Sequence, residues 1–259
     1  MSELHTNVQW LVRQAHGPVR ARLICLPYAG GNARVFHGWA ESLRGVEILA
    51  VEAPGKGKRV LEQPCDDIDV YCKALMTELA PVLAEPLPYS FFGHSNGAIV
   101  AFEICCRLQT LGAPLPQQLL LSACGAPWSR APRRYSALDD DAFKALLRDF
   151  DATPPAILAN DALLDLLLPG LRADFAIGDF YESKWPALRG VASHVFYGTQ
   201  DSIPEAEIFA WQQRIGSPVG FEPVQGGHFY IHDERDALLA AIARQLSVAQ
   251  QRDTTAMAI

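Results

Sequence analysis

Residues 89–100 read Tyr-Ser-Phe-Phe-Gly-His-Ser-Asn-Gly-Ala-Ile-Val, and they constrain the fold of this chain more than any other segment. The apolar run predicts a buried strand, Gly93 and Gly97 predict a tight turn around Ser95, and the residues that follow predict a helix. A strand, turn and helix in this order form a nucleophile elbow, which exposes the serine hydroxyl at the top of a sheet. Because short motifs of this kind occur by chance, the interpretation depends on what the rest of the chain places beside Ser95.

The overall composition excludes several classes of protein. The 259 residues include 22 Lys and Arg and 29 Asp and Glu, a net charge of −7 without any basic run, which argues against nucleic-acid binding. The first ten residues lack the pattern of a signal peptide, and no apolar run approaches the ~18 residues that span a membrane, so we expect a monomeric cytoplasmic protein without membrane contact. The six cysteines form no C-x-x-C pair and no Cys/His metal spacing, so we expect neither a disulfide framework nor a metal site.

Short apolar runs predict the other strands, and helical spacing predicts helices between them. Strands are expected at residues 22–26, 46–51, 89–94, 118–123, 193–198 and 219–224, and helices at 33–43, from Asp66 or Asp67 to Leu83, at 96–111, 204–215 and 233–248. This alternation predicts an α/β protein with a mainly parallel central sheet flanked by helices. The loops after the strands should then gather at one edge of the sheet.

The alternation of strands and helices stops after Pro127. Residues 127–186 contain no convincing strand, and helices are expected at 139–150, 161–167 and 171–181, with Pro154-Pro155 and Pro169-Gly170 between them. Leucines lie nearly all round residues 163–168, so we expect both faces of that helix to be covered. An insertion of this size beside the site edge is interpreted as a helical lid, although it could instead be a subdomain that only fills core.

We therefore expect one domain over residues 1–259. Its core would comprise about residues 20–127 and 187–248, and its lid about residues 128–186, inserted before the strand that carries the acid. Residues 1–20 are expected to be a polar lead-in and residues 249–259 a polar tail.

A serine hydroxyl is a weak nucleophile that needs a base, and the base needs an acid to orient it. In the α/β-hydrolase order the acid and then the histidine follow the serine. Asp201 lies just past one predicted strand and His228 just past the next, which places both at the edge where Ser95 emerges. The alternatives are His94 and His232 as the base, and Asp174, Asp179, Glu205 and Glu207 as the acid.

Two backbone amides are predicted to stabilise an oxyanion. One is the N–H of Asn96, the residue after the serine. The second should come from the loop after the first strand, where small residues let the backbone approach a ligand, and we assign it to Ala29. The alternative is that Gly30 and Gly31 only make a turn.

Six motifs together resemble the type II thioesterases, stand-alone α/β-hydrolases that accompany polyketide and non-ribosomal peptide assembly lines. The motifs are Leu26-Pro27-Tyr28-Ala29-Gly30-Gly31, Pro54-Gly55-Lys56-Gly57-Lys58-Arg59, Gly93-His94-Ser95-Asn96-Gly97, Thr153-Pro154-Pro155, Leu168-Pro169-Gly170-Leu171-Arg172-Ala173-Asp174-Phe175 and Gly226-Gly227-His228-Phe229-Tyr230. They occur in the family's order, and the resemblance covers roughly residues 10–245.

The resemblance implies hydrolysis of acyl groups from the phosphopantetheine arm of carrier proteins, to clear stalled chains or to release product, without a cofactor of the enzyme's own. Ser95, Asp201 and His228 match the family's triad, and Ala29 and Asn96 match its oxyanion donors. Tyr28 and Phe229 are candidate contacts to the substrate or lid. The chain departs from the family by Asn96 in place of the common methionine, by Lys56 in place of arginine, and by the Gly-Thr-Gln that precedes Asp201.

Carrier proteins are generally acidic, so an enzyme of net charge −7 needs a local basic patch to bind them. Candidate docking residues are Arg130, Arg133 and Arg134 at the lid entrance, with Lys56, Lys58 and Arg59 in the Pro-Gly loop. The alternative for each is an ordinary solvated charge.

Three rival functions remain open. The chain could be an esterase or lipase that acts on oxygen esters, or a hydrolase-fold binding protein without activity, although an intact Ser, Asp and His set argues against the latter. A cyclising thioesterase domain from a larger enzyme is the third, which the short N-terminus and the lack of room for a carrier domain disfavour.

Overall fold

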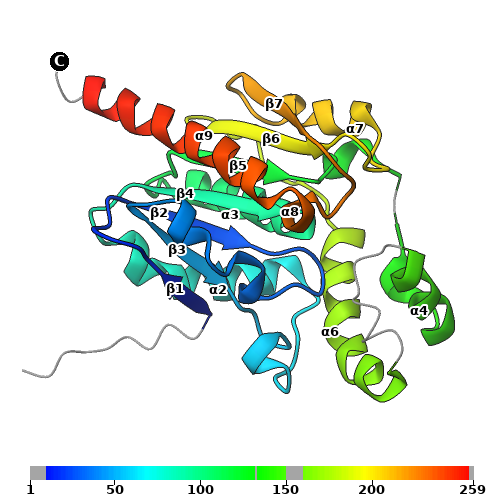
Figure 1. Cartoon of the computed structure of the whole chain (residues 1–259). Coiled ribbons are helices and arrows are strands. Elements are labelled where there is room, and N and C mark those ends of the chain that lie inside the picture. Colours follow the sequence, from blue (N-terminus) through cyan, green and yellow to red (C-terminus); the bar gives the residue numbers. More distant parts are fainter. Residues whose placement is uncertain (1–9, 132, 150–159, 257–259) are drawn as a thin grey trace, which may run out of the picture.

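The computed structural model of the chain describes residues 10–131, 133–149 and 160–256. Seven strands form one sheet in the order β1-β3-β2-β4-β5-β6-β7 (Figure 1). They are β1 (Leu11–Gln14), β2 (Ala21–Leu26), β3 (Val46–Val51), β4 (Tyr89–His94), β5 (Gln118–Ser122), β6 (Ala192–Gly198) and β7 (Val219–Val224). Only β1 pairs antiparallel, and the other pairs are parallel, as expected of a mainly parallel α/β sheet.

The strand β1 was not predicted, because its residues were assigned to a polar lead-in. Its four residues, Leu-Val-Arg-Gln, show no alternation of apolar and polar side chains, and only Leu11 among them is buried. Leu11 faces Val51 across the pair, and the edge of β3 provides the hydrogen bonds that make this short segment a strand. Tertiary pairing, rather than local sequence, therefore decides its conformation.

Helices cover both faces of the sheet (Figure 1). One face packs against α2 (Ile68–Leu83) and α3 (Asn96–Thr110), and the other against α1 (Trp39–Ser42), α8 (Tyr230–Asp233) and α9 (Arg235–Ala256). A further helix, α7 (Glu205–Phe209), follows β6. Asp67 caps α2, as one of the two predicted caps, by accepting a hydrogen bond from the Val70 N–H at 2.9 Å.

Several of the predicted helices differ from those observed. The segment 204–215 divides into α7 and a 3-10 turn (Ala210–Gln213). The segment 33–43 divides into a 3-10 turn (Ala33–Phe36) and α1, because Gly38 between them is left-handed with φ 76°. In contrast, α9 continues to Ala256, so the expected helix end at residue 248 was wrong and residues 249–256 of the polar tail are helical. These residues include no glycine or proline that would end the helix.

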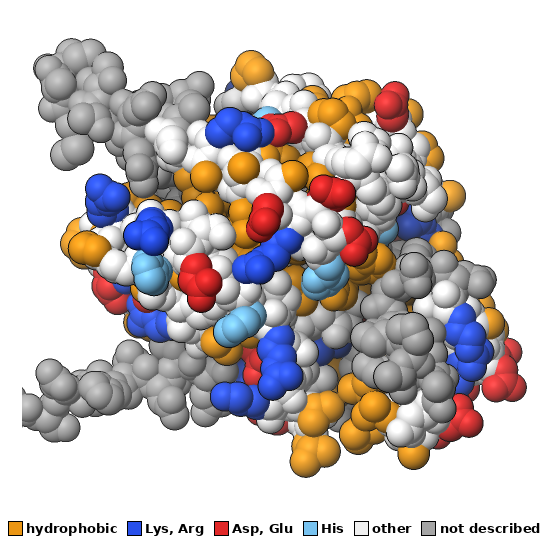
Figure 2. Space-filling view, in the orientation of Figure 1, with side chains coloured by type: hydrophobic (Ala, Val, Ile, Leu, Met, Phe, Trp, Pro, Cys, Tyr) orange, Lys and Arg blue, Asp and Glu red, His pale blue; other side chains and the backbone are white. Residues whose placement is uncertain are grey.

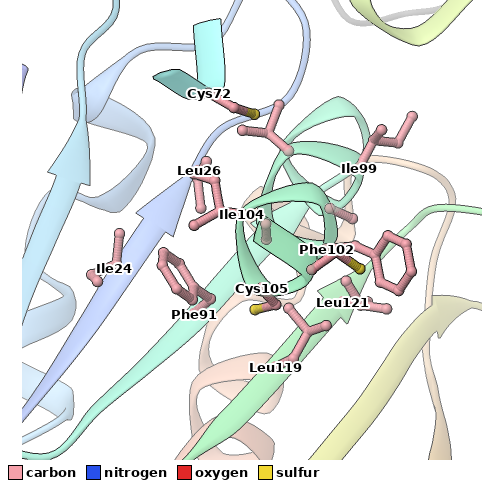
Figure 3. Packing of buried hydrophobic residues seen from close by; sticks show 14 of the residues in the cluster. Ile24, Leu26, Cys72, Phe91, Ile99, Phe102, Ile104, Cys105, Leu119 and Leu121 are labelled. Carbon is pink, nitrogen blue, oxygen red and sulfur yellow. The ribbon is translucent and has the colours of Figure 1, made fainter. Parts of the chain in front are cut away.

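The largest apolar cluster lies between α3 and the central strands (Figure 3). Ile24, Phe91 and Leu119 point from β2, β4 and β5 toward Phe102 and Cys105 on α3. All five side chains are fully buried. Because α3 follows the turn at Ser95 directly, this packing fixes the helix and the turn relative to the sheet.

The segment interpreted as a lid contains α4 (Asp140–Asp149) and α6 (Asp161–Asp179), which lie together beyond the carboxyl ends of the strands (Figure 1). They share a small apolar cluster of Phe143, Leu147, Leu164, Leu168 and Leu171, separate from the clusters of the sheet. The predicted Thr153-Pro154-Pro155 break lies outside the described residues.

Two expectations about α6 were wrong. The helix runs unbroken through Pro169 and Gly170, where we expected a gap. Gly170 lies close to the backbone of Gly55, and its carbonyl accepts a hydrogen bond from Lys56 Nζ at 2.9 Å, so contacts with the body of the protein hold the helix at this point. Leu163 and Leu166 are exposed, so only part of this leucine-rich helix is covered.

Candidate active site

Ser95 lies in a strained turn between β4 and α3. Its φ of 54° and ψ of −118° are unfavourable for a residue with a side chain. The Ser95 N–H donates to the Ser122 carbonyl at 2.7 Å, which ties the turn to β5. A side chain at Gly93 would overlap the Gly97 carbonyl, and one at Gly97 would overlap the carbonyl of Leu26. Both positions therefore require glycine, as the motif predicts.

The structure brings the predicted acid, histidine and serine together at the carboxyl edge of the sheet. Asp201 follows β6, His228 follows β7, and His228 Nδ1 lies 2.8 Å from Asp201 Oδ2. The other ring nitrogen, His228 Nε2, lies 3.0 Å from Ser95 Oγ. With Nδ1 donating to the carboxylate, Nε2 can accept the serine proton.

His94, one of the two alternative bases, is fully buried and is not among the residues that line the cavity. Its Nε2 donates to the His228 carbonyl at 3.0 Å, and its Nδ1 accepts from the Ser122 hydroxyl at 2.9 Å. Burial, together with the nearby His228, holds the pKa of His94 well below its ordinary value. A neutral His94 thus fixes the backbone of His228.

His232, the other alternative base, faces a different partner. It lies on α8, and its Nε2 is 2.8 Å from the hydroxyl of Tyr28. The ring of Tyr28 packs edge-on against Phe229, with centroids 5.1 Å apart. Tyr28 and Phe229, the predicted substrate or lid contacts, therefore meet beside Ser95 and line the same cavity.

The predicted oxyanion donors lie next to this serine. Ala29 and Asn96 both line the cavity that contains Ser95 and His228. Asn96 is the first residue of α3, where a backbone N–H has no acceptor within the helix and is free to bind a developing negative charge.

A family model described as "Thioesterase domain" matches residues 21–246. The chain belongs to the thioesterase family. Thioesterase PikA5 of Streptomyces venezuelae is 32% identical over 93% of this chain and 86% of its own length. The gramicidin S biosynthesis protein GrsT of Aneurinibacillus migulanus is 26% identical over 92% of this chain and 94% of its own length.

Two solved structures of type II thioesterases have the same fold as this thioesterase. YbtT, from the yersiniabactin NRPS/PKS pathway, superposes with a TM-score of 0.83 at 30% identity and covers 93% of this chain and 99% of its own. BorB, from the borrelidin biosynthetic cluster, gives a TM-score of 0.79 at 32% identity and covers 94% and 98%. The resemblance to type II thioesterases is confirmed, and the chain is a serine thioester hydrolase with an α/β-hydrolase sheet.

The cavity of this thioesterase, about 320 Å³, is formed by the body and the lid together. Its apolar lining comes from both parts and includes Ile99, Leu147, Leu171, Phe175 and Ile203. Its polar lining includes Arg130, Arg133, Asp179 and Glu207. The wall beside Ser95 is thus mixed in polarity, and Asn96 contributes to it.

Burial rules out one of the predicted docking residues. Lys56 is buried and forms an ion pair with Asp174, so its assignment as a docking residue was wrong. Arg130 donates to the Gly178 carbonyl at 2.7 Å, and Arg133 lies over the ring of Tyr135 and lines the cavity. Both arginines are half-buried, and their role in docking stays a prediction.

The other three basic candidates differ in exposure. Lys58 and Arg134 are exposed, whereas Arg59 donates to Glu62 at 2.8 Å. On the face that Figure 2 shows, basic and acidic side chains are interspersed. Docking by Lys58, Arg59, Arg130, Arg133 and Arg134 stays a prediction.

Two absences hold for residues 10–131, 133–149 and 160–256. No three or more His, Cys, Asp or Glu side chains among them gather in a way that could hold a metal ion. Nor does any helix within these ranges have the length and apolar character that crossing a membrane requires.

One contact in the site was not predicted, namely that between the Pro-Gly loop and the lid. Asp174 was considered only as an alternative acid and Lys56 only as a docking residue, yet the two form an ion pair across 118 residues of sequence. Both lie in motifs of the family resemblance. Their pairing depends on how α6 crosses the sheet edge, which no local pattern encodes.

Proposed function

We propose that this thioesterase hydrolyses acyl groups carried on the phosphopantetheine arm of carrier proteins in polyketide or non-ribosomal peptide synthesis, through an acyl-enzyme on Ser95. The observation that carries the proposal is the hydrogen-bonded chain from Ser95 through His228 to Asp201. YbtT supports the choice of pathway, since it is a type II thioesterase of an NRPS/PKS pathway, and BorB is a type II thioesterase of a biosynthetic cluster as well.

In the first half of the reaction, His228 Nε2 accepts the hydroxyl proton as Ser95 Oγ attacks the thioester carbonyl. The amides of Ala29 and Asn96 bind the oxyanion of the tetrahedral intermediate. Asp201 keeps the proton on His228 Nδ1 and stabilises the imidazolium that forms. Collapse of the intermediate expels the thiolate of the arm, which accepts a proton from His228.

In the second half, water attacks the acyl-enzyme and His228 accepts its proton. The tetrahedral intermediate uses the same two amides, and its collapse returns the proton to Ser95 and releases the carboxylic acid. A thiolate is a better leaving group than an amine, so the leaving group needs little assistance from an acid. The arm belongs to the substrate, and we propose that the enzyme itself uses no cofactor.

The proposal is tested with a panel of acyl-carrier proteins and matched simple oxygen esters. We expect carrier-bound thioesters to be hydrolysed with the higher kcat/KM, and a Ser95→Ala variant to lose turnover by a factor on the order of 10⁴ or more. Ser247→Ala, on the exposed face of α9, is the control and should match the wild type. Preference for the simple esters would favour the esterase alternative and contradict the proposal.

A covalent probe separates catalysis from binding alone. A fluorophosphonate should label the wild type and not Ser95→Ala, as read by intact mass. Failure of the wild type to label would favour a binding protein without the proposed acyl-enzyme chemistry.

A further inference from the structure

We propose that Asp174, in the lid, is a positioning residue. It holds in place the two segments that carry the oxyanion donors Ala29 and Asn96. This inference rests on the proposed function, because it concerns the stabilisation of the same tetrahedral intermediate. Asp174 belongs to α6, whereas Ala29 follows β2 and Asn96 begins α3. One residue of the lid thus contacts both sides of the site.

The first contact is to the loop that contains Ala29. Asp174 Oδ2 accepts a hydrogen bond at 2.6 Å from the N–H of Gly30, the next residue in the chain. Gly30 is left-handed with φ 83°, and a Cβ there would lie 2.6 Å from Leu171 Cδ2. Leu171 and Asp174 are three residues apart and share one face of α6. That face fixes the loop at two points, and with it the direction of the Ala29 amide.

The second contact is to the elbow itself. The side-chain Nδ2 of Asn96 donates to the backbone carbonyl of Asp174 at 2.9 Å. One turn further along α6, Gly178 leaves space for the same side chain, because a Cβ there would lie 3.0 Å from Asn96 Oδ1. The side chain of Asn96 therefore joins the start of α3 to the lid, while its backbone N–H stays available at the site.

The third contact, with Lys56, neutralises the negative charge of the Asp174 carboxylate. A lone carboxylate beside a developing oxyanion would repel it and raise the barrier. Lys56 Nζ pairs with the same Oδ2 and also donates to the Gly170 carbonyl at 2.9 Å. The side chains of Lys56 and Asp174 are only 9% and 12% exposed, so solvent screens the pair little. The pair can thus bind the loop without adding net negative charge near the reaction.

The experiment compares Asp174→Ala, which removes the acceptor of the Gly30 N–H, with Asp174→Asn, whose amide oxygen can still accept that bond. The matched control is Asp165→Asn, on the same helix, where the carboxylate pairs with Lys144 and is exposed. Each variant is assayed for kcat and KM on a small acyl thioester, for inhibition by a trifluoromethyl ketone that adds to Ser95, and for urea unfolding.

We expect Asp174→Ala to lower kcat and the affinity for the ketone by about tenfold to a hundredfold each, with KM nearly unchanged, because mispositioned donors affect chiefly the tetrahedral species. Asp174→Asn should retain more of both quantities, and Asp165→Asn should match the wild type. Lys56→Met should also lower kcat, and the double variant Lys56→Met with Asp174→Asn should recover part of that loss, since it removes the unpaired charge.

A loss confined to KM or to the urea midpoint, with kcat and ketone affinity intact in Asp174→Ala, would overturn the proposal. Should Asp174→Ala not fold, Asn96→Ala carries the test, because it removes the bond to the Asp174 carbonyl and keeps the Asn96 N–H. Wild-type kcat and ketone affinity in that variant would then overturn the proposal. The small thioester separates this test from that of the proposed function. If wild type hydrolyses it but no carrier-bound acyl group, the carrier assignment fails while the comparison of Asp174 variants still decides.

Discussion

The body and the lid of this thioesterase are built on different physical principles, although both line one cavity. In the body, Ser95, Asp201 and His228 stand at the ends of hydrogen-bonded strands, and the turn of Ser95 is tied to β5 and to α3. The lid has its own small apolar cluster and meets the site through polar contacts, including Asn96 with Asp174 and Lys56 with Gly170. The body therefore holds the three catalytic residues, and the lid contacts the segments that surround them.

A change at the body's acid should have the largest effect. Asp201→Asn leaves the shape of the site but lets His228 adopt the wrong tautomer, so we expect kcat to fall by about 10⁴-fold. Steady-state hydrolysis of a small acyl thioester measures this, with urea unfolding as the check on folding. A decrease below tenfold would mean that Asp201 is not the acid, and the alternatives in α6 and α7 would need to be tested.

Two buried phenylalanines test whether the body and lid unfold separately. Phe102 on α3 packs against Trp128 and Trp211, and Phe143 on α4 packs against Phe175, and both are fully buried. Replacing either with alanine removes about 3–5 kcal/mol of packing. We expect Phe102→Ala to lower the global free energy of unfolding by that amount.

Phe143→Ala should instead accelerate amide hydrogen exchange in α4 and α6 while the urea midpoint of the body decreases much less. Hydrogen exchange read by mass spectrometry, together with urea unfolding, distinguishes local opening of the lid from global unfolding of the protein. Equal losses of global stability would show that lid and body form one cooperative unit, and the contrast between them would be wrong.

The smallest expected effect is a pH dependence of stability from His94. Its pKa is held well below 6.5 in the folded protein by burial, whereas the unfolded chain binds a proton near pH 6.5. The unfolded state therefore binds more protons as the pH falls, so this contribution to stability is complete above about pH 6.5 and is lost below it, by up to ~1.4 kcal/mol per pH unit.

His94→Gln removes this titration. Urea unfolding between pH 7 and pH 5 should show a shallower slope in the variant, while His194 and His232, whose pKa values are also lowered by burial, contribute equally to both proteins. An unchanged slope would indicate that His94 is protonated when folded, contrary to the neutral tautomer that its hydrogen bonds imply.

The elbow and the strands on either side of it were predictable because their signals are local. Gly93, Ser95 and Gly97 require one backbone geometry, and apolar runs such as residues 46–51 gave the strand limits without error. The placement of Asp201 and His228 followed from the parallel topology alone, since successive strands in such a sheet end at the same edge.

The remaining features depended on distant contacts. β1 exists because β3 offers it an edge, and α6 continues through Pro169 while the body holds its next residue through Lys56. As a cation in a loop, Lys56 was predicted to lie on a docking surface. In the structure it is buried beside Asp174 and forms an internal ion pair.

The sequence by itself determined the type of fold, the turn that holds Ser95 and the edge where the three polar residues meet. Steric requirements and hydrophobic periodicity act over a few residues, so they can be read directly from the order of amino acids. Only the tertiary structure decided which charges are buried, how the lid contacts the loop of Ala29, and which ring nitrogen meets which partner. Those outcomes depend on desolvation and distance between segments more than a hundred residues apart, which no local pattern contains.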